Sequence, residues 1–234
     1  AGLSRGLGDV YKRQDYYKIP YPGTKLDLIA IPDFAMGAME NVGAVTFREN
    51  LLLFDKDKAT RSELDRSITV IAHELAHMWF GDLVTMKWWD GIWLNEAFAS
   101  LMEVIASYNT YPEFKQWNAM NMSRTAGFSI DSLENSRPVE FDVETPDQAE
   151  EMFDVLTYEK GSTVLRMFQM FIGEEAFQNG VEAYLNKFKF ENTNSSDLWD
   201  ALSEASNQPL NKILPFWIRE KGYPFLQVEC SNNS

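Results

Sequence analysis

The chain of 234 residues is 45% hydrophobic and 14% aromatic, which suffices for the packed core of one domain and a piece of another. Its net charge of −14 argues against nucleic acid or an anionic membrane as a partner, because both reward clustered Lys and Arg. The single cysteine, Cys230, excludes an intrachain disulfide, and no apolar run approaches the roughly 18 residues of a membrane-spanning helix.

The first segment, residues 1–14, is expected to be foreign to the protein. Its "GDVYKRQ" resembles the translated end of a transposase adapter used in preparing sequencing libraries, so the fold is sought in the residues that follow. A genuine N-terminal arm is the alternative, and reading the source DNA across this junction distinguishes the two.

Residues 16–50 are predicted to form strands. Short apolar or alternating stretches, "KLDLIAI" and "VGAVTFRE", flank the five residues "GAMEN" at positions 37–41, and such patterns are typical of strands. Taken alone, GAMEN indicates a tight turn that exposes Glu40 to solvent.

The period of the apolar residues changes at Thr60, where a helix is predicted to begin. Thr60 and Glu63 fit a Thr-x-x-Glu capping box. Apolar residues then recur on most sides of the segment, which is typical of a buried helix. One stripe consists of Leu64, Ile68, Ile71, Leu75 and Trp79. A second helix is predicted from about Trp93 to about Tyr108.

The remainder is predicted to be one long loop followed by helices. Residues 127–156 are acidic, interrupted by prolines and without periodicity, which indicates a loop region. Helices are predicted at about 157–171, 174–188 and 196–205, and a last one is predicted to end at Gly222 before Pro224. Because "YPFLQVEC" alternates like a strand, residues 223–234 are expected to be the first strand of a truncated C-terminal β domain.

The chain has two histidines, His73 and His77, and both lie in "HELAH" on the first predicted helix. At positions i and i+4 their imidazoles leave the helix on one side and can share one ion. Zinc suits imidazole and carboxylate ligands with one position left for water. Glu74 is turned by about 100° from His73, so it can reach that water as a general base without being a ligand. Two histidines in the core of a buried helix are the alternative interpretation.

A third protein ligand cannot be a histidine, because none remains. Glu96 in "WLNEAFAS" is the candidate, on the second predicted helix with eighteen residues between it and His77. Glu103 follows on nearly the same helix face, where it can orient a ligand. A solvated helix acid is the alternative interpretation of Glu103.

Three separated motifs together resemble the aminopeptidase N family of zinc metallopeptidases, which are gluzincins. They are GAMEN, "HELAHMWFGDLVTMKWWDGIWLNEAFAS" and "FDVLTYEKGSTVLRMF", in the order of the family, and the resemblance covers about residues 15–225. It implies an α+β fold over residues 15–222, a thermolysin-like domain with a small N-terminal mixed β-sheet followed by a mainly helical lobe.

The resemblance also implies a catalytic role for each matching residue. His73, His77 and Glu96 would hold one Zn²⁺ ion, and Glu74 would activate water. Tyr158 matches the tyrosine that stabilises the tetrahedral intermediate, for which a phenol hydroxyl can donate a hydrogen bond to the developing oxyanion.

GAMEN acquires a second interpretation from the same resemblance. Glu40 would hold the free α-amino group of the substrate, with Gly37 and Ala38 on an edge segment where a peptide backbone can approach. Two departures from the common family pattern, Asp82 in place of Asn and Ala97 in place of Gly, change neither a ligand nor the base.

The implied function is a zinc-dependent aminopeptidase that hydrolyses the N-terminal peptide bond of peptides with a free N-terminus, in the cytoplasm. A bifunctional relative that also opens a lipid epoxide is one alternative, although Ala38 favours the plain peptidase. A scaffold homologue without zinc and a fragment with poor turnover are the others. Neither nucleic acid nor a membrane span is expected, and the oligomeric state is left open.

Overall fold

A three-stranded sheet forms the N-terminal part of the computed structural model, which describes residues 14–55 and 57–230 of the chain. Its strands are β1 (Asp27–Ile31), β2 (Ala38–Met39) and β3 (Ala44–Arg48). In the order β1-β3-β2, β1 runs parallel to β3 and β2 antiparallel to it, so the sheet is mixed, as predicted. Within the described residues β2 pairs with β3 alone, which makes it an edge strand.

Alternation along β3 determines which face of the sheet is buried. Val45 and Phe47 are fully buried, whereas Ala44 and Thr46 are half-buried, as expected when successive side chains point to opposite faces. The short helix α2 (Glu49–Leu52) follows directly.

The predicted strand region begins too early, because residues 14–17 are helical. Tyr17 is fully buried there, with its ring centroid 5.2 Å from that of Trp79 and 5.6 Å from that of Phe80. The aromatic residues of this entry segment therefore contribute to the core through a helix rather than through a strand.

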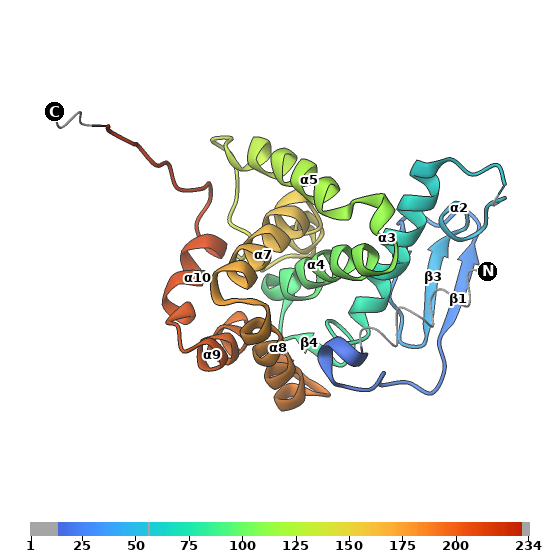
Figure 1. Ribbon diagram of the computed structural model, residues 1–234, viewed down its shortest axis with the longest axis horizontal. Coiled ribbons are helices and arrows are strands. Elements are labelled where there is room, and N and C mark those ends of the chain that lie inside the picture. The colour runs from blue at the N-terminus through green and yellow to red at the C-terminus, as the bar shows by residue number, and fades with distance from the viewer. Residues whose placement is uncertain (1–13, 56, 231–234) are drawn as a thin grey trace.

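Two long helices, α3 (Arg61–His77) and α4 (Ile92–Thr110), pack against each other at the centre of the molecule (Figure 1). The predicted capping box is confirmed, since Thr60 Oγ1 accepts from the Glu63 backbone N–H and the Glu63 carboxylate accepts from the Thr60 backbone N–H. Residues 92–99 of α4 are all buried, so this stretch has no solvent face. Both predicted helices are confirmed.

The connection between α3 and α4 is tied to a distant part of the chain. Its strand β4 (Val84–Met86) pairs in parallel with β5 (Glu191–Thr193), and the short helix η1 (Trp89–Gly91) then leads into α4. At the ends of this pair, the Phe190 backbone N–H donates to Leu83 O at 2.6 Å and the Lys87 N–H donates to Thr193 O at 2.8 Å. The segment after His77 is thus held by residues more than a hundred positions later.

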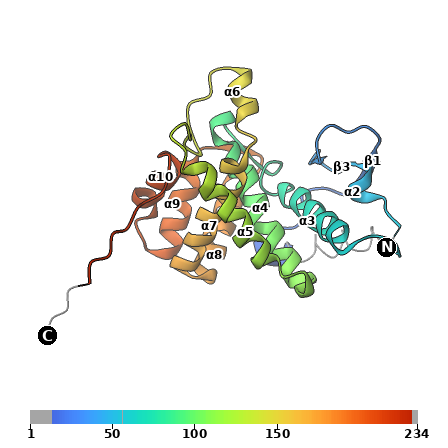
Figure 2. The same ribbon diagram turned by 90° about the horizontal axis from the view of Figure 1, so that it is seen from above.

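The region predicted as a long loop, residues 127–156, is partly helical, so that prediction is wrong at its start and in its second half. The turn η2 (Pro112–Phe114) precedes α5 (Gln116–Asp131), and α6 (Pro146–Glu151) lies inside the predicted loop, at the edge of the molecule (Figure 2). α6 begins with a capping box at Thr145 and a proline in its first turn. These are local signals that apolar periodicity does not detect in a helix of six residues.

The C-terminal half forms a helical lobe on the side of the molecule away from the sheet (Figures 1 and 2). It consists of the π-helical turn η3 (Leu156–Lys160), α7 (Gly161–Ile172), α8 (Glu174–Phe188), α9 (Ser195–Ser206) and α10 (Leu210–Ile218). The three helices predicted between 157 and 205 are confirmed.

The last helix ends at Ile218. The sequence pattern predicted an end at Gly222, so that prediction is wrong by four residues. Gly222 lies beyond it with φ +77°, and its backbone N–H donates to Asp131 Oδ1 at 2.9 Å. The Gly222 N–H therefore donates to a distant side chain instead of to a helical carbonyl.

The two chain ends are only partly described. Residues 223–230 form no strand within the described part of the chain, and Leu226 and Val228 are 83% and 82% exposed. A strand needs a partner strand to be stable, and the described residues offer none to this segment. The β domain expected from residue 223 therefore stays a prediction. Of the segment 1–14, all but Gln14 lies outside the described residues, so its foreign origin also stays a prediction.

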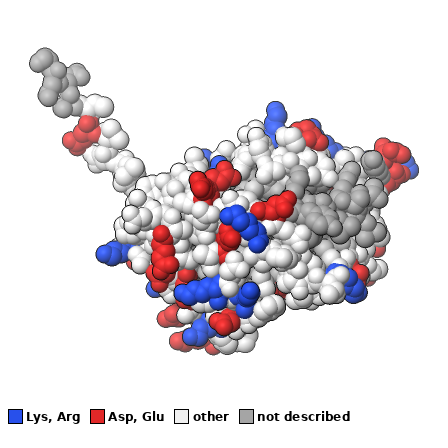
Figure 3. Space-filling view, turned by 60° about the horizontal axis from the view of Figure 1, so that its bottom comes forward, with Lys and Arg blue, Asp and Glu red and all other residues white. Residues whose placement is uncertain are grey.

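The surface carries charges of both signs. On the face drawn in Figure 3, the coloured Lys and Arg side chains lie among Asp and Glu rather than in one basic patch. Among the described residues, no helix combines the length and the apolar character that crossing a bilayer requires.

Candidate metal centre and active site

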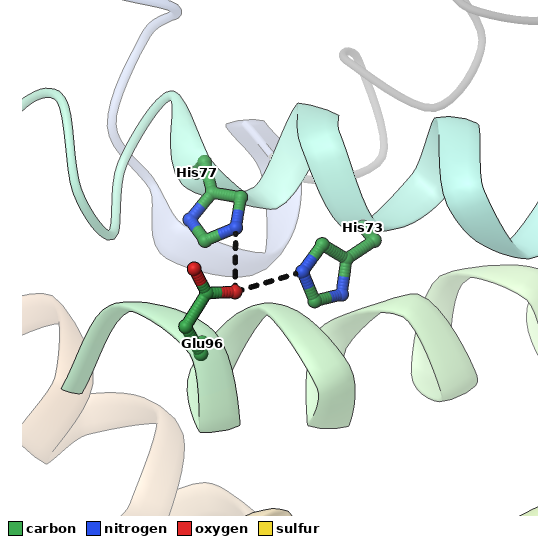
Figure 4. Close-up of side chains that lie close together, drawn as sticks. All are labelled: His73, His77 and Glu96. Atoms are coloured by element: carbon green, nitrogen blue, oxygen red, sulfur yellow. Dashed lines mark hydrogen bonds and ion pairs between the residues drawn. The ribbon is translucent and has the colours of Figure 1, made fainter. Parts of the chain in front are cut away.

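The two histidines of α3 and Glu96 of α4 lie together between the two helices. Figure 4 shows both imidazoles directed from α3 toward the Glu96 carboxylate. Glu96 Oε2 lies 3.1 Å from His73 Nε2 and 3.3 Å from His77 Nε2. The spacing of four residues on one helix therefore brings both rings to one point, to which the buried helix α4 supplies a carboxylate.

This donor set fits a zinc ion. The three ligand atoms all lie within 4.8 Å of one another. With zinc–nitrogen bonds of ~2.0–2.1 Å, two ligand atoms of a tetrahedral site lie about 3.3 Å apart. Both distances to Glu96 Oε2 match that separation, and two imidazoles with a carboxylate are ligands that zinc accepts.

The second nitrogen of each imidazole has a partner that fixes the ring. His73 Nδ1 lies 2.8 Å from Glu103 Oε2, and His77 Nδ1 lies 2.9 Å from the backbone oxygen of Phe80. These contacts direct both Nε2 atoms toward Glu96. Glu103 is therefore the partner of His73 rather than a freely solvated acid.

Gly81 allows the turn that presents the Phe80 carbonyl to His77. Its φ of +128° is one that side chains with a Cβ rarely adopt, and a Cβ there would lie 3.3 Å from His77 Nδ1. The glycine at position 81, shortly after HELAH, therefore has a local structural cause.

The charges in the cluster favour a cation. Burial lowers the pKa of the His77 imidazole, but the charge and hydrogen bond of Glu96 outweigh burial and raise this pKa to about 9. Burial likewise raises the pKa of Glu96, but the two imidazoles outweigh it and hold the pKa well below its usual range. A metal ion is stabilised by the same carboxylate and competes with the imidazole protons.

Glu74 is the buried acid beside this cluster. Its side chain is 6% exposed, and its Oε2 atom has no hydrogen-bond partner among the described residues. Burial raises the pKa of Glu74 to about 7, which is the range in which a carboxylate can both take and return a proton near neutral pH.

Glu40 reaches the cluster from the sheet. It directly follows β2, is half-buried, and has a carboxylate oxygen within 4.8 Å of ligand atoms of Glu74 and His77. The residues before it form the edge strand, with Ala38 opposite Phe47 and Gly37 O accepting from the Arg48 backbone N–H at 2.9 Å. The interpretation of GAMEN as a tight turn with an exposed acid is therefore wrong.

Tyr158 enters from the helical lobe, on the π-helical turn η3. Its ring stacks on that of His73 at an interplanar angle of 25° and a centroid distance of 6.0 Å. Burial, followed by the charge and hydrogen bond of Glu96, raises the pKa of the phenol far above its usual value. The hydroxyl therefore keeps its proton and remains a donor across the physiological pH range.

One further acid, Asp82, lies near the cluster and was singled out in the sequence only as a departure from a family pattern. Its Oδ2 atom is buried with no hydrogen-bond partner among the described residues. Burial, and then the charge of Glu40, raise its pKa to about 7. The sequence signal for its placement near the cluster was its position directly after Gly81, shortly after HELAH.

A small mixed sheet, a helical lobe, and a pair of helices that present two histidines and a glutamate to one point are the features of a metallopeptidase domain. The family described as "Peptidase family M1 domain" matches residues 9–217, and the chain belongs to this family. The resemblance drawn from the three motifs is thereby confirmed at the level of the family.

Curated relatives support the same assignment. The chain is 45% identical to "Aminopeptidase M1-A" of Oryza sativa subsp. japonica over 94% of its own length and 25% of the relative. It is 46% identical to "Probable aminopeptidase 1" of Sulfurisphaera tokodaii over 99% of the chain and 29% of the relative. It is also 46% identical to "Puromycin-sensitive aminopeptidase" of Caenorhabditis elegans, over 92% and 23% respectively. The chain spans about a quarter of the length of these relatives.

Proposed function

We propose that the protein is a zinc-dependent aminopeptidase that removes single residues from peptides with a free N-terminus, and that residues 15–222 are its catalytic domain. The observation that carries the proposal is the meeting of His73, His77 and Glu96 at tetrahedral spacing, with Glu74 beside them. Membership of a peptidase family and relatives named aminopeptidases support the same conclusion.

His73, His77 and Glu96 would hold one Zn²⁺ ion. When bound, this ion supplies Lewis acidity, which polarises a carbonyl and lowers the pKa of water. The outer partners Glu103 and Phe80 O keep the two imidazoles in the orientation that this requires.

Glu74 is the proposed general base. It takes the proton of the attacking water and then passes it to the leaving amine, which restores its own charge. A buried carboxylate with an unpartnered Oε2 and a pKa of about 7 is suited to this exchange.

Tyr158 is the proposed oxyanion donor. Its protonated hydroxyl, near Glu96 and with its ring against His73, can donate a hydrogen bond as negative charge develops on the carbonyl oxygen.

Glu40 is the proposed anchor for the substrate ammonium, and this contact would make the enzyme an exopeptidase. Gly37 and Ala38 precede it along the edge of the sheet, where an extended substrate backbone can pair with β2. If Glu40 holds the terminal amine, the first peptide bond is the one that reaches Glu74.

The test is hydrolysis of a leucine anilide by the whole protein, with zinc content measured on the same sample. We expect about one zinc per chain, loss of activity with a chelator, and recovery with added Zn²⁺. Zinc content near zero would favour a scaffold instead, and equal turnover of the N-acetylated substrate would remove the amine anchor. Hydrolysis of a lipid epoxide would identify the bifunctional alternative, and a cytoplasmic location stays a prediction for cell fractionation.

A further inference from the structure

Tyr158 stands on the least regular helical element of the lobe. The turn η3 is π-helical over its five residues, Leu156–Lys160, and π-helical turns are rare and persist where the surroundings hold them. The Tyr158 backbone N–H donates to Asp154 O at 3.2 Å, so the direction of the phenol depends on the residues just before the turn.

Asp154 holds the first residues of this turn through its side chain. Its Oδ1 atom accepts from the Leu156 backbone N–H at 2.9 Å and from the Thr157 backbone N–H at 3.2 Å. These are two of the donors that a helix start leaves without an intrahelical partner, so the carboxylate fixes the turn as an N-cap does.

Arg137 connects the same carboxylate to a segment seventeen residues earlier. Its Nη2 atom lies 2.5 Å from Asp154 Oδ1 and donates to Thr157 Oγ1 at 2.9 Å. Its Nη1 atom donates to Pro138 O at 2.7 Å, which fixes the guanidinium itself. The Arg137 guanidinium thus contacts both Asp154, which caps the turn, and Thr157, the residue directly before Tyr158.

A second ion pair holds the other end of the turn. Lys160 Nζ lies 2.9 Å from Asp131 Oδ2 and donates to Gly222 O at 2.9 Å, and both charged side chains are buried. Because this end is fixed, a change at Arg137 or Asp154 should alter the first half of the turn, from Leu156 to Tyr158, rather than shift the whole of α7.

We propose that Arg137 and Asp154 are positioning residues for Tyr158: they hold the π-helical turn in the geometry that directs the phenol toward His73 and Glu96. The proposal deepens the function proposed above and rests on the role of Tyr158 given there. A displacement of a reacting group by about 1 Å can cost ~10²-fold in rate, so a pair that never touches substrate can still control the reaction.

The first test observes Tyr158 directly and does not depend on activity. With 3-fluorotyrosine at position 158 of the zinc-loaded protein, we expect one sharp ¹⁹F resonance. Arg137→Lys keeps the positive charge but loses the planar guanidinium with its several donors. It should therefore shift or split that resonance. Arg219→Lys is the matched control, because Arg219 Nη2 lies 2.7 Å from Glu140 Oε1 and the pair makes no hydrogen bond with the turn. An unchanged resonance in Arg137→Lys overturns the proposal.

The second test is kinetic. Removing an oxyanion donor outright costs ~10²–10³-fold, so a displaced Tyr158 in Arg137→Lys should lower kcat by about 10-fold and change KM by less than about 2-fold. In a Tyr158→Phe background the same substitution should have no further effect on kcat. A loss that persists in that background shows that Arg137 acts elsewhere and overturns the proposal.

Two provisions keep these tests decisive. If Arg137→Lys does not fold, Thr157→Val removes one acceptor of the fork at a buried position while keeping the side-chain shape, and the same two readouts apply. If the parent protein hydrolyses no anilide, the proposed function fails, but the ¹⁹F comparison still decides whether Arg137 positions Tyr158.

Discussion

The metal cluster and the two groups proposed to act around it are supported in different ways. His73, His77 and Glu96 come from two long helices packed along each other, and every residue of α4 from 92 to 99 is buried. Glu40 follows a two-residue edge strand, and Tyr158 lies on a single π-helical turn. The positions of the three proposed ligands therefore depend mainly on the packing of two helices, whereas the positions of Glu40 and Tyr158 depend on a few hydrogen bonds.

The largest expected effect is the loss of a ligand from the packed region. His77→Ala should leave the fold intact but lower zinc affinity by more than the ~10–100-fold typical of losing an outer partner, and anilide hydrolysis should fall below detection. Competition with a chromophoric chelator measures the affinity. Zinc bound as tightly as in the parent protein would remove His77 from the ligand set.

The next effect concerns the sheet edge. Glu40→Gln should raise KM and lower kcat/KM by ~10–100-fold, as for a lost charged contact in a dry site, with zinc content unchanged. Steady-state kinetics on the leucine anilide measure it, with the exposed Glu204→Gln as the matched control. An unchanged kcat/KM would exclude Glu40 from substrate binding.

The third prediction concerns the contact between α4, which carries Glu96, and α7, which follows the turn that carries Tyr158. Gly161 begins α7, and a Cβ there would lie 2.7 Å from Ala97 Cβ on α4. Gly161→Ala should therefore lower the free energy of unfolding by ~1–3 kcal/mol through overpacking, as measured by urea denaturation.

Two variants check the cause of that loss. Adding Ala97→Gly should relieve the overlap and restore part of the stability. Gly127→Ala, at a helical glycine where the nearest atom is 3.7 Å away, should be neutral or slightly stabilising. If Gly161→Ala is as stable as the parent, the helices have more room than the contact implies.

The smallest expected effect is a pH-dependent one at Asp82. The folded state raises its pKa from 3.8 to about 7, so between these values the folded carboxyl keeps a proton that the unfolded one has lost. Stability contributed by the protonated form is present below pH 4 and is lost as the pH rises to 7.

Asp82→Asn removes this dependence. In protein freed of metal by a chelator, Asp82→Asn should raise the free energy of unfolding at pH 8 by an amount on the order of 1 kcal/mol, after allowance for partial exposure. At pH 4 it should leave the free energy of unfolding unchanged. Chemical denaturation at the two values measures it, with the exposed Asp33→Asn as control. An equal gain at both pH values would contradict the burial of a charged Asp82.

The same difference between the regions explains what the sequence could predict. Helical period placed His73 and His77 on one side of a helix, because a spacing of four residues has one geometric meaning in a helix. Glu96 was the carboxylate candidate on the next predicted helix. The mixed sheet and the helical lobe followed from apolar patterns and from the resemblance. The site was therefore most predictable where its residues stand on long regular elements.

The rest depends on contacts between residues far apart in the sequence. No period indicated that Arg137 meets Asp154, that η3 is π-helical, or that Asp82 turns its carboxylate inward. Residues 127–156 were expected to be a loop because the six residues of α6 are specified by a cap and a proline rather than by a stripe. Tyr158 was identified by resemblance alone, since nothing in its own neighbourhood distinguishes it from a packing residue.

The pairing of β4 with β5 has a consequence for the order of events during synthesis. The turn that orients His77 through Phe80 O is completed by strand residues 84–86, whose partners lie at 191–193. Until residue 193 has left the ribosome, this pairing cannot form, and the loop that it closes spans the residues between positions 86 and 191. The residues of the proposed metal centre, 73–96, are synthesised early, but the turn that orients His77 is completed late, so a nascent chain that stops before β5 should bind zinc weakly.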